Sequence, residues 1–383
     1  MEAKWQELLA GNGRSSRGVE KGVATQSSII VVKLGDRGRE SFARTTEIMR
    51  AIKFVVEKAI ELEMPLVVNL SLGTNDGAHS GSSLFTTYLD DMEEMLRANF
   101  VVSSGNEGFA AHHYSAIIGK GETLDINFKT IPNLASLYLA FWKDFTDTFE
   151  VELVAPNGQS SGKISPYTRF KIIDIGGTIV NVYNNIPVQY NQEQEIFFRF
   201  IPPIADGIWK LIVTGLEITD GRFNIWLPTM EEVTAQTGFL IPSVETTLTI
   251  PATSRNAITV GGYNSRTNGI ADFSGRGYTR NNVYVKPDLV APAINVLTTK
   301  AGGGYDRFSG TSAAAPFVTG TCALMMEWGI IDENDPFLYG QRVKAFLRKG
   351  ATRMQNVVYP NPRWGYGRLC IRDTLNYLVQ YKT

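Results

Sequence analysis

Short apolar runs alternate with amphipathic stretches in the first third of the chain. Runs rich in β-branched residues occupy 29–35 (IIVVKLG), 65–73 (PLVVNLSLG) and 100–108 (FVVSSGNEG). Between them, apolar residues recur at helical spacing over 44–63 and 84–98. Strands that are apolar on both faces and alternate with helices are typical of a buried parallel sheet. The pattern therefore predicts an α/β sheet whose ligand sites lie at the carboxyl ends of its strands.

The pattern changes between residues 113 and 245. Many short strands, separated by turn sequences such as PNG and TDG, replace the alternation of strands and helices. Such a segment is typical of an all-β sandwich or jelly roll. The α/β pattern resumes in 246–383. We therefore expect one core domain, formed by 1–112 and 246–383, that is interrupted once by a β insert over 113–245.

The composition excludes several classes of function. With 43% hydrophobic residues, 20% charged residues and a formal net charge of −1, the chain resembles a soluble globular protein and has no general attraction to nucleic acid or anionic membrane. No apolar run reaches the roughly 18–20 residues of a membrane span, and the N-terminus lacks the apolar segment of a secretory signal. Cys322 and Cys370 lie in apolar contexts, so we expect buried free thiols in a reducing compartment.

The stretch FSGTSAAAP (308–316) is the most informative for chemistry. A glycine-flanked loop brings Ser312 to the start of a helix, where the first N–H groups and the dipole favour nearby negative charge. A serine hydroxyl becomes an effective nucleophile when a neighbouring base takes its proton. Taken alone, however, a serine before an alanine run more often caps a buried helix than performs catalysis.

Other segments favour the catalytic interpretation. GTSAAAP resembles the G-T-S-x-A-x-P signature of the nucleophilic serine in the subtilase family, and SSGNEG resembles the family segment that carries the oxyanion-hole asparagine. The resemblance implies that Ser312 is the nucleophile. It also implies that Asn106 donates its side-chain amide to the oxyanion, alongside the backbone N–H of Ser312. Without this context, an asparagine in a glycine turn is more often an Asx-turn residue.

The resemblance extends over roughly 8–112 and 246–383. It implies a subtilisin-like three-layer αβα core around the parallel sheet, with a jelly-roll-like insert, and a serine-type endopeptidase activity. An extended protein or peptide substrate would bind by strand addition. Two backbone segments would form the walls of the pocket for the residue before the scissile bond: Ser71, Leu72 and Gly73 on one side, and Ser103, Ser104 and Gly105 on the other.

Within the family, the sequence resembles the clostridial germination proteases of the Csp type, because GNEG runs into AHHY and then into a long β insert. This resemblance implies a cytoplasmic or spore-associated protein that processes a cortex-lytic enzyme precursor, or helps to regulate that processing. Some members of the group have lost catalytic residues and act as pseudoproteases. The alternative function is therefore binding in a spore germination complex, with another protease-family chain or a propeptide as partner.

The Asp and His of the catalytic triad are not found where the family places them. Triad residues run Asp, His, Ser along a subtilase chain, and the family's His position coincides with Met1. None of the histidines in the chain occupies that position: His79, His112 and His113. We interpret them as packing or surface residues; the alternative is that one of them approaches the cleft and acts as a replacement general base. Asp76 has no base to orient, and Asp288 is predicted to be structural. We therefore expect a fragment, a truncated gene product or one piece of a split protease, which is inactive alone.

Signals for cofactors are weak. The sequence contains no HExxH motif, no cysteine-rich ligand set and no EF-hand loop, and no glycine-rich phosphate loop follows a strand. We therefore expect no cofactor and assign no metal ligands. Calcium is a candidate only because subtilases often bind it, and the sequence indicates no site for it.

Overall fold

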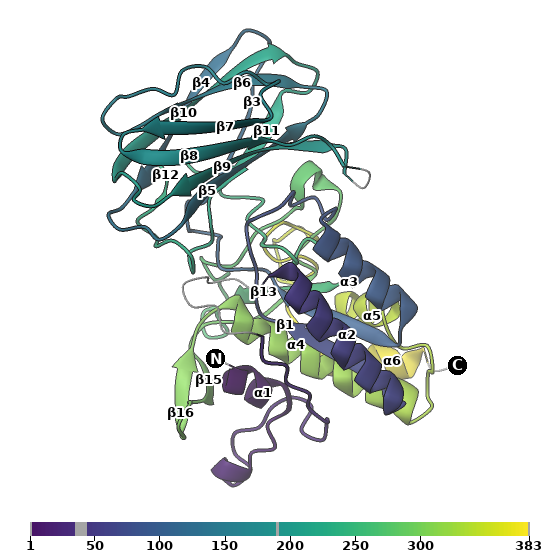
Figure 1. Ribbon diagram of the computed structural model, residues 1–383. Helices are drawn as coiled ribbons and strands as arrows, with labels where there is room; N and C mark the ends of the chain where they lie inside the picture. The colour runs from purple at the N-terminus through teal and green to yellow at the C-terminus, as the bar shows by residue number, and fades with distance from the viewer. Residues whose placement is uncertain (1, 35–43, 189–190, 382–383) are drawn as a thin grey trace. The chain divides into compact units, whose positions relative to one another are not determined.

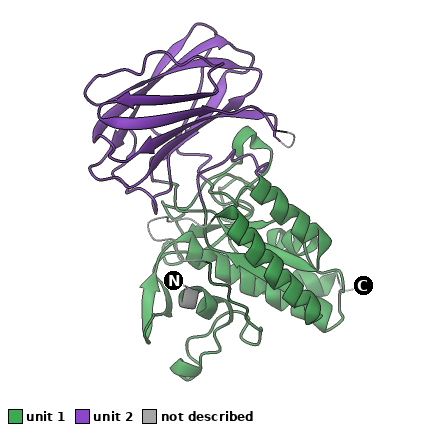
Figure 2. Cartoon of the chain, viewed as in Figure 1, with its two compact units in different colours: residues 1–73, 84–108, 248–383 green, residues 74–83, 109–247 purple. Residues whose placement is uncertain are grey.

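A computed structural model describes residues 2–34, 44–188 and 191–381, and it divides the chain into two compact units (Figure 2). Unit 1 comprises Met1–Gly73, Leu84–Gly108 and Leu248–Thr383; unit 2 comprises Thr74–Ser83 and Phe109–Thr247. The predicted class, an α/β domain with an all-β insert, is confirmed. The segment 74–83, which is predicted to belong to the core domain, belongs to the β unit instead.

Unit 1 is built on a four-stranded parallel sheet in the order β1-β2-β13-β14 (Figure 1). Its strands are β1 (Leu66–Leu70), β2 (Ala98–Ser103), β13 (Ile258–Tyr263) and β14 (Leu289–Pro292). Leu70 of β1 pairs with Val102 of β2, so these two strands end side by side. The two predicted walls of the substrate pocket, 71–73 and 103–105, therefore begin at the same edge of the sheet.

Helices surround this sheet, and a β-hairpin precedes the buried helix α4. The helices are α1 (Glu2–Ala10), α2 (Thr45–Glu61), α3 (Leu84–Met95), α4 (Thr311–Met326), α5 (Gln341–Gly350) and α6 (Ile371–Gln380), and the hairpin is β15 (Val296–Thr299) with β16 (Tyr305–Phe308). Short helical turns occupy Arg14–Ser16, Arg280–Asn282 and Glu327–Ile331. The two helices predicted over 44–63 and 84–98 are confirmed as α2 and α3. In α2, Ile48, Ile52, Val56 and Ala59 are buried at helical spacing, which explains the amphipathic pattern.

The helix that follows the proposed nucleophile loop is the core helix of unit 1. Ala314 in α4 packs in one buried cluster with Val101 and Ile258 of the sheet. Thr311–Ile331 is the one helical stretch in the described part of the chain that is long and apolar enough to cross a membrane, but 61% of its apolar window is buried. Burial against the sheet identifies it as a core helix rather than a membrane span. Both cysteines are free thiols, Cys322 buried in α4 and Cys370 half-buried.

The strand predicted at 29–35 is not formed by the residues that the structure describes there, 29–34. Leu34 packs against the buried cluster that contains α2 and β2 residues. Ile29, Ile30 and Val31 instead remain 41–50% exposed. A β-branched run forms a strand when a neighbouring strand supplies hydrogen bonds and cross-strand contacts. The run is apolar, but no partner strand pairs with it among the described residues.

Unit 2 consists of two antiparallel sheets, β3-β11-β5-β9-β8-β7 and β12-β4-β10-β6 (Figure 1). The strands are β3 (His113–Ile117), β4 (Thr123–Thr130), β5 (Leu137–Asp144), β6 (Thr148–Val154), β7 (Phe170–Ile175), β8 (Thr178–Asn184), β9 (Glu193–Ile201), β10 (Gly207–Glu217), β11 (Arg222–Trp226) and β12 (Gly238–Phe239). Alternating buried residues from both sheets meet in an aromatic core that includes Phe128, Phe141 and Trp209. This arrangement explains the period-two pattern of the insert.

Candidate active site

The loop between β16 and α4 brings Ser312 to the first turn of the buried helix. Gly310 is the N-cap residue and has a φ of 150°, a conformation that side-chain-bearing residues rarely adopt. Its N–H donates to the carbonyl of Ala293 at 2.9 Å, which fixes the loop to the sheet. Ser312 therefore lies inside the first turn rather than at the N-cap, so the capping role considered from the sequence does not apply. Its backbone N–H is one of those without an intrahelical acceptor.

Asn106, just beyond β2, is fixed against this loop through one end of its amide. Its Oδ1 accepts the backbone N–H of Thr311 at 3.0 Å and lies 3.2 Å from the Thr311 hydroxyl. The same hydroxyl lies 3.2 Å from the carbonyl oxygen of Gly105. Because Oδ1 is the acceptor, Nδ2 is the end of the amide that remains to donate to a ligand. The sequence motif includes Thr311, but its role as the residue that orients Asn106 is visible only in the structure.

The first predicted pocket wall lies beside Ser312. The hydroxyl of Ser312 is 3.4 Å from the carbonyl of Ser71, and the hydroxyl of Ser71 is 3.4 Å from the carbonyl of Ser312. Asn69 donates to the Ser71 hydroxyl at 2.9 Å and accepts from Thr319 of α4 at 3.0 Å. The end of β1 is thereby tied to the helix that carries Ser312. Leu72 and Gly73 follow and are half-buried.

The second predicted wall continues β2. The N–H of Ser104 donates to the carbonyl of Val260 in β13 at 2.9 Å, while Ser103 and Ser104 are buried and Gly105 is half-buried. Thr249 donates its N–H to the carbonyl of Ser104 at 3.2 Å. Nothing in the segment LTIPATS distinguishes Thr249 from its other threonines, so its contact with Ser104 is visible only in the structure.

The three histidines all belong to unit 2 and are buried there. The indole of Trp226 is stacked between His79, at 4.0 Å between ring centroids, and His113, at 4.8 Å. Nε2 of His113 lies 3.0 Å from Oδ1 of Asn224, and burial lowers the pKa of this imidazole to about 4. Nε2 of His112 lies 3.0 Å from a backbone carbonyl. These contacts favour the interpretation as packing histidines.

Asp288 lies immediately before β14, at the amino end of the sheet. Its carboxylate contacts Lys286 at 3.0 Å, Lys344 at 3.4 Å and the guanidinium of Arg348. Burial alone would raise its pKa, but the three cations outweigh that effect and hold the pKa far below its usual range. The environment of Asp288 supports the predicted structural role. Asp76, the other aspartate considered from the sequence, belongs to unit 2.

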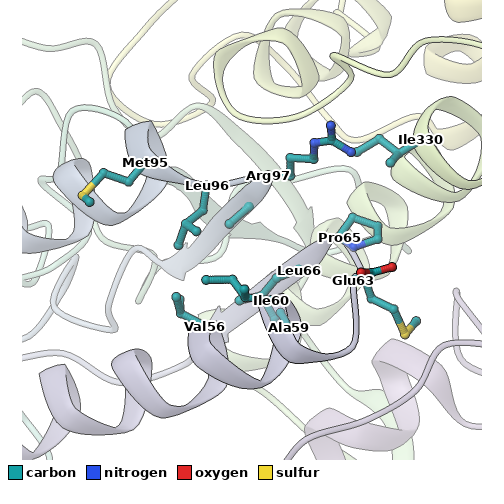
Figure 3. Close-up of a pocket in the computed structure, with 12 residues that line it drawn as sticks. Val56, Ala59, Ile60, Glu63, Pro65, Leu66, Met95, Leu96, Arg97 and Ile330 are labelled. Carbon is teal, nitrogen blue, oxygen red and sulfur yellow. The ribbon is translucent and has the colours of Figure 1, made fainter.

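Two further observations concern ligands. A pocket of about 520 Å³ lies where α2 and α3 end and β1 and β2 begin, with mainly aliphatic side chains such as Ile60 and Leu66 around it (Figure 3). None of the candidate site residues lines it, so it is not the proposed substrate cleft.

Within the described ranges, no group of three or more His, Cys, Asp or Glu side chains could hold a metal ion. A calcium site therefore stays an unassigned prediction.

The parallel sheet, with a buried core helix that begins beside Ser312, has the subtilisin-like fold. The model of the subtilase family matches residues 8–169 and 241–367, and the chain belongs to this family. The Csp resemblance is also confirmed: the solved CspB protease of Clostridium perfringens is 40% identical with a TM-score of 0.91, over 98% of this chain and 79% of that one.

Curated relatives match over shorter segments. An intracellular serine protease of Paenibacillus polymyxa is 36% identical over 86 residues, which is 21% of this chain and 26% of that protein. The PII-type proteinase of Lactococcus lactis subsp. cremoris is 38% identical over 68 residues, 18% of this chain. The match spans only 4% of the length of the lactococcal proteinase. These relatives support the family assignment and not a particular substrate.

Proposed function

We propose that this chain carries the nucleophile and the oxyanion hole of a subtilisin-like serine endopeptidase. In the proposed reaction the Ser312 oxygen attacks the scissile carbonyl carbon, and its proton passes through a base to the leaving amine as the C–N bond breaks. Water then hydrolyses the acyl-enzyme and restores the hydroxyl. The observation that carries the proposal is the pair of contacts from Thr311 to Oδ1 of Asn106, which leaves the amide Nδ2 to donate beside Ser312.

The oxyanion that forms during attack needs donors that are already in position. The Ser312 N–H and Nδ2 of Asn106 are the two donors, and the amino end of α4 adds a favourable dipole. An extended protein or peptide substrate would pair with the backbone at 71–73 and 103–105 by strand addition. The residues Ser71, Leu72, Gly73, Ser103, Ser104 and Gly105 would thus bind the substrate rather than react with it.

The chain alone is expected to be inactive, because no residue that the structure describes supplies a base to Ser312. Among the described residues, the hydroxyl of Ser312 contacts the carbonyl of Ser71, which cannot accept its proton. The histidines pack around Trp226 or against unit 2 backbone. In a subtilisin, loss of the histidine alone lowers turnover about 10⁶-fold. We propose that an Asp and a His outside these 383 residues complete the peptidase.

The missing base also favours a second function, a pseudoprotease that binds a partner. The cleft backbone would still bind an extended peptide, such as a propeptide or a segment of another protease-family chain, because strand addition does not need a base. The resemblance of the sequence to the Csp-type germination proteases favours binding in a spore germination complex, in the cytoplasm or associated with the spore. The two functions differ in one respect: only the first requires a reactive Ser312.

Labelling with a fluorophosphonate probe tests this difference. The serine oxygen displaces fluoride from phosphorus, so labelling reports a hydroxyl that a base can activate. We expect slow labelling of the chain alone and faster labelling when imidazole is added at high concentration, as a soluble substitute for the absent side chain. A positioned base accelerates a reaction by about 10²–10⁴-fold, and we expect free imidazole to raise the labelling rate at least about tenfold. Ser312→Ala should abolish the imidazole-dependent part.

Three outcomes would contradict the proposal or the expected inactivity. Labelling that is equally fast in Ser312→Ala would show that another residue reacts, and Ser312 would have no special reactivity. Folded protein that is not labelled even with imidazole would favour the binding function. Fast labelling without imidazole would instead contradict the expected inactivity, because a base within the chain would then reach Ser312.

A further inference from the structure

Asn69 is a polar residue inside the otherwise apolar strand β1. Asparagine is unfavourable in strands, where β-branched and aromatic residues fit best. Val67, two residues before it, packs in the buried cluster that contains α4 residues, and side chains two residues apart in a strand point to the same face. Asn69 therefore faces the helix that carries Ser312. Residues that break a local rule in this way are expected at functional or strained sites.

The amide of Asn69 connects β1 to α4 in two ways. Its Oδ1 accepts from the hydroxyl of Thr319 in α4 at 3.0 Å, and its Nδ2 donates to the hydroxyl of Ser71 at 2.9 Å. That hydroxyl in turn lies 3.4 Å from the carbonyl oxygen of Ser312. Because the Ser71 oxygen accepts from Asn69, its own hydrogen is available to the Ser312 carbonyl. One side chain thus links the strand to the body of the helix and to its first turn.

Asn106 holds the same turn from the neighbouring strand. It accepts from the backbone N–H of Thr311, the residue before Ser312, whereas Asn69 acts through Ser71 on Ser312 itself. The proposed oxyanion hole combines the N–H of Ser312 with Nδ2 of Asn106. Its geometry therefore depends on where the first turn of α4 lies relative to both strands.

The contacts of Asn69 affect position more than stability, because neither hydroxyl has Asn69 as its sole partner. The Thr319 hydroxyl also lies 3.0 Å from the carbonyl of Ala315, and the Ser71 hydroxyl lies near the carbonyl of Ser312. Loss of the amide would leave both hydroxyls with an acceptor. The large cost of a lost hydrogen bond arises when a buried group is left unpaired, so this loss should cost little stability.

We propose that Asn69 is a positioning residue of the peptidase site: it holds the first turn of α4 against the end of β1, so that the hydroxyl and the N–H of Ser312 meet the scissile carbonyl together. This inference rests on the proposed function. Asn69 acts through Ser71 and Thr319 rather than by contact with the reacting atoms. A misplacement of about 1 Å caused by a distant substitution can slow a reaction about 10²-fold, so a lost tether should reduce the reactivity of Ser312.

Asn69→Leu tests this, because leucine keeps the branching at Cγ and removes both hydrogen bonds. We expect the maximal rate of imidazole-dependent labelling of Ser312 by the fluorophosphonate probe to fall about tenfold or more. The probe concentration that gives half of this rate should stay within about twofold, because the lost contacts act on the reaction and not on probe binding. The urea midpoint should change little.

Thr319→Val and Thr321→Val form a matched pair within α4. Both threonines are buried and donate to the carbonyl four residues earlier, that of Ala315 or Phe317, and of the two it is Thr319 that contacts Asn69. Thr319→Val should slow labelling, and Thr321→Val should leave it unchanged. When Asn69→Leu and Thr319→Val are combined, the two effects should not add, because both substitutions remove the same contact.

The outcomes separate this inference from the proposed function. If wild type is labelled and Asn69→Leu is labelled equally fast, the inference is wrong and the peptidase proposal stands. A slower rate together with a large loss of stability, or an equal slowing in Thr321→Val, would also overturn the inference, because Asn69 would then support the fold of α4 rather than position Ser312. If wild type is not labelled even with imidazole, the proposed function fails and the inference fails with it.

Discussion

The two ends of the parallel sheet in unit 1 use polar groups in opposite ways. At the carboxyl ends of β1 and β2, the candidate residues Ser312 and Asn106 and the adjoining Thr249 carry uncharged hydroxyls and an amide; Ser312 and Asn106 are half-buried and Thr249 is buried. At the amino end of β14, Asp288 is fully buried and surrounded by cations. At the amino end the charged groups form ion pairs with one another, whereas at the carboxyl end the uncharged groups keep donors for a ligand. The contrast assigns stability to one end and binding to the other.

Removal of the Asp288 charge should give the largest effect and is the most direct way to break this comparison. Asp288→Asn leaves the buried Lys286 and Lys344 and the half-buried Arg348 without their anion, and removal of one partner from a buried ion pair destabilises by about 3–5 kcal/mol. Urea unfolding at neutral pH measures the change. Asp332→Asn, on an exposed aspartate, should change stability by less than about 0.5 kcal/mol. Equal stabilities of the two variants would contradict a structural role for the charged end.

At the carboxyl end of the sheet, we expect substitutions to change the reactivity of Ser312. Asn106→Asp keeps an oxygen for Thr311 but replaces the Nδ2 donor with a carboxylate oxygen, and Asn106→Ala removes both. Loss of one oxyanion-hole donor typically costs about 10²–10³-fold. We expect both variants to slow imidazole-dependent labelling of Ser312 by that amount, with little change in the urea midpoint. A large loss of stability with unchanged labelling would contradict the comparison, because it would give Asn106 a structural role and no role in the reactivity of Ser312.

Much of this arrangement could be predicted from the sequence. The alternation of β-branched runs and amphipathic segments gave β1, β2, α2 and α3, because burial on both faces leaves a distinct pattern. The motif around Ser312 identified the loop before α4. The insert was recognised as all-β because its alternation has period two.

Other features depended on contacts between distant segments. The run at 29–34 has the composition of a strand but pairs with no strand among the residues that the structure describes, and a partner is not encoded locally. The segment 74–83 belongs to unit 2 although it follows β1 directly, because packing such as that of His79 on Trp226 decides its place. Thr249 has its position only because two glycines, far away in the sequence, approach it.

Glu93 of α3 is the exception at the charged end and gives the smallest expected effect. Both of its carboxylate oxygens are buried without a hydrogen bond within the described residues. Burial raises its pKa to about 8; the charges of Lys344 and Lys286 oppose this rise, and those of Asp90 and Asp288 add to it. In the unfolded chain the pKa of a glutamate is about 4.3. The folded protein therefore holds a proton on Glu93 that the unfolded chain releases between these two values.

The contribution of Glu93 to the free energy of unfolding should fall as the pH rises. Because the folded state binds the extra proton, the contribution of Glu93 to stability is fully present below about pH 4.3 and is lost as the pH rises towards 8, by at most about 1.4 kcal/mol per pH unit. Glu93→Gln cannot ionise, so its stability relative to wild type should increase between pH 5 and pH 8. Burial also lowers the pKa of Lys344, to about 7, but this lysine is present in both proteins, so the pH dependence that it causes largely cancels in the difference.

Urea midpoints of wild type and Glu93→Gln, measured at each pH, test this prediction, with Glu94→Gln, on an exposed carboxylate, as control. If Glu93→Gln and wild type lose stability in parallel over this range, Glu93 is ionised in the folded protein, and the charged end is paired more completely than its hydrogen bonds indicate.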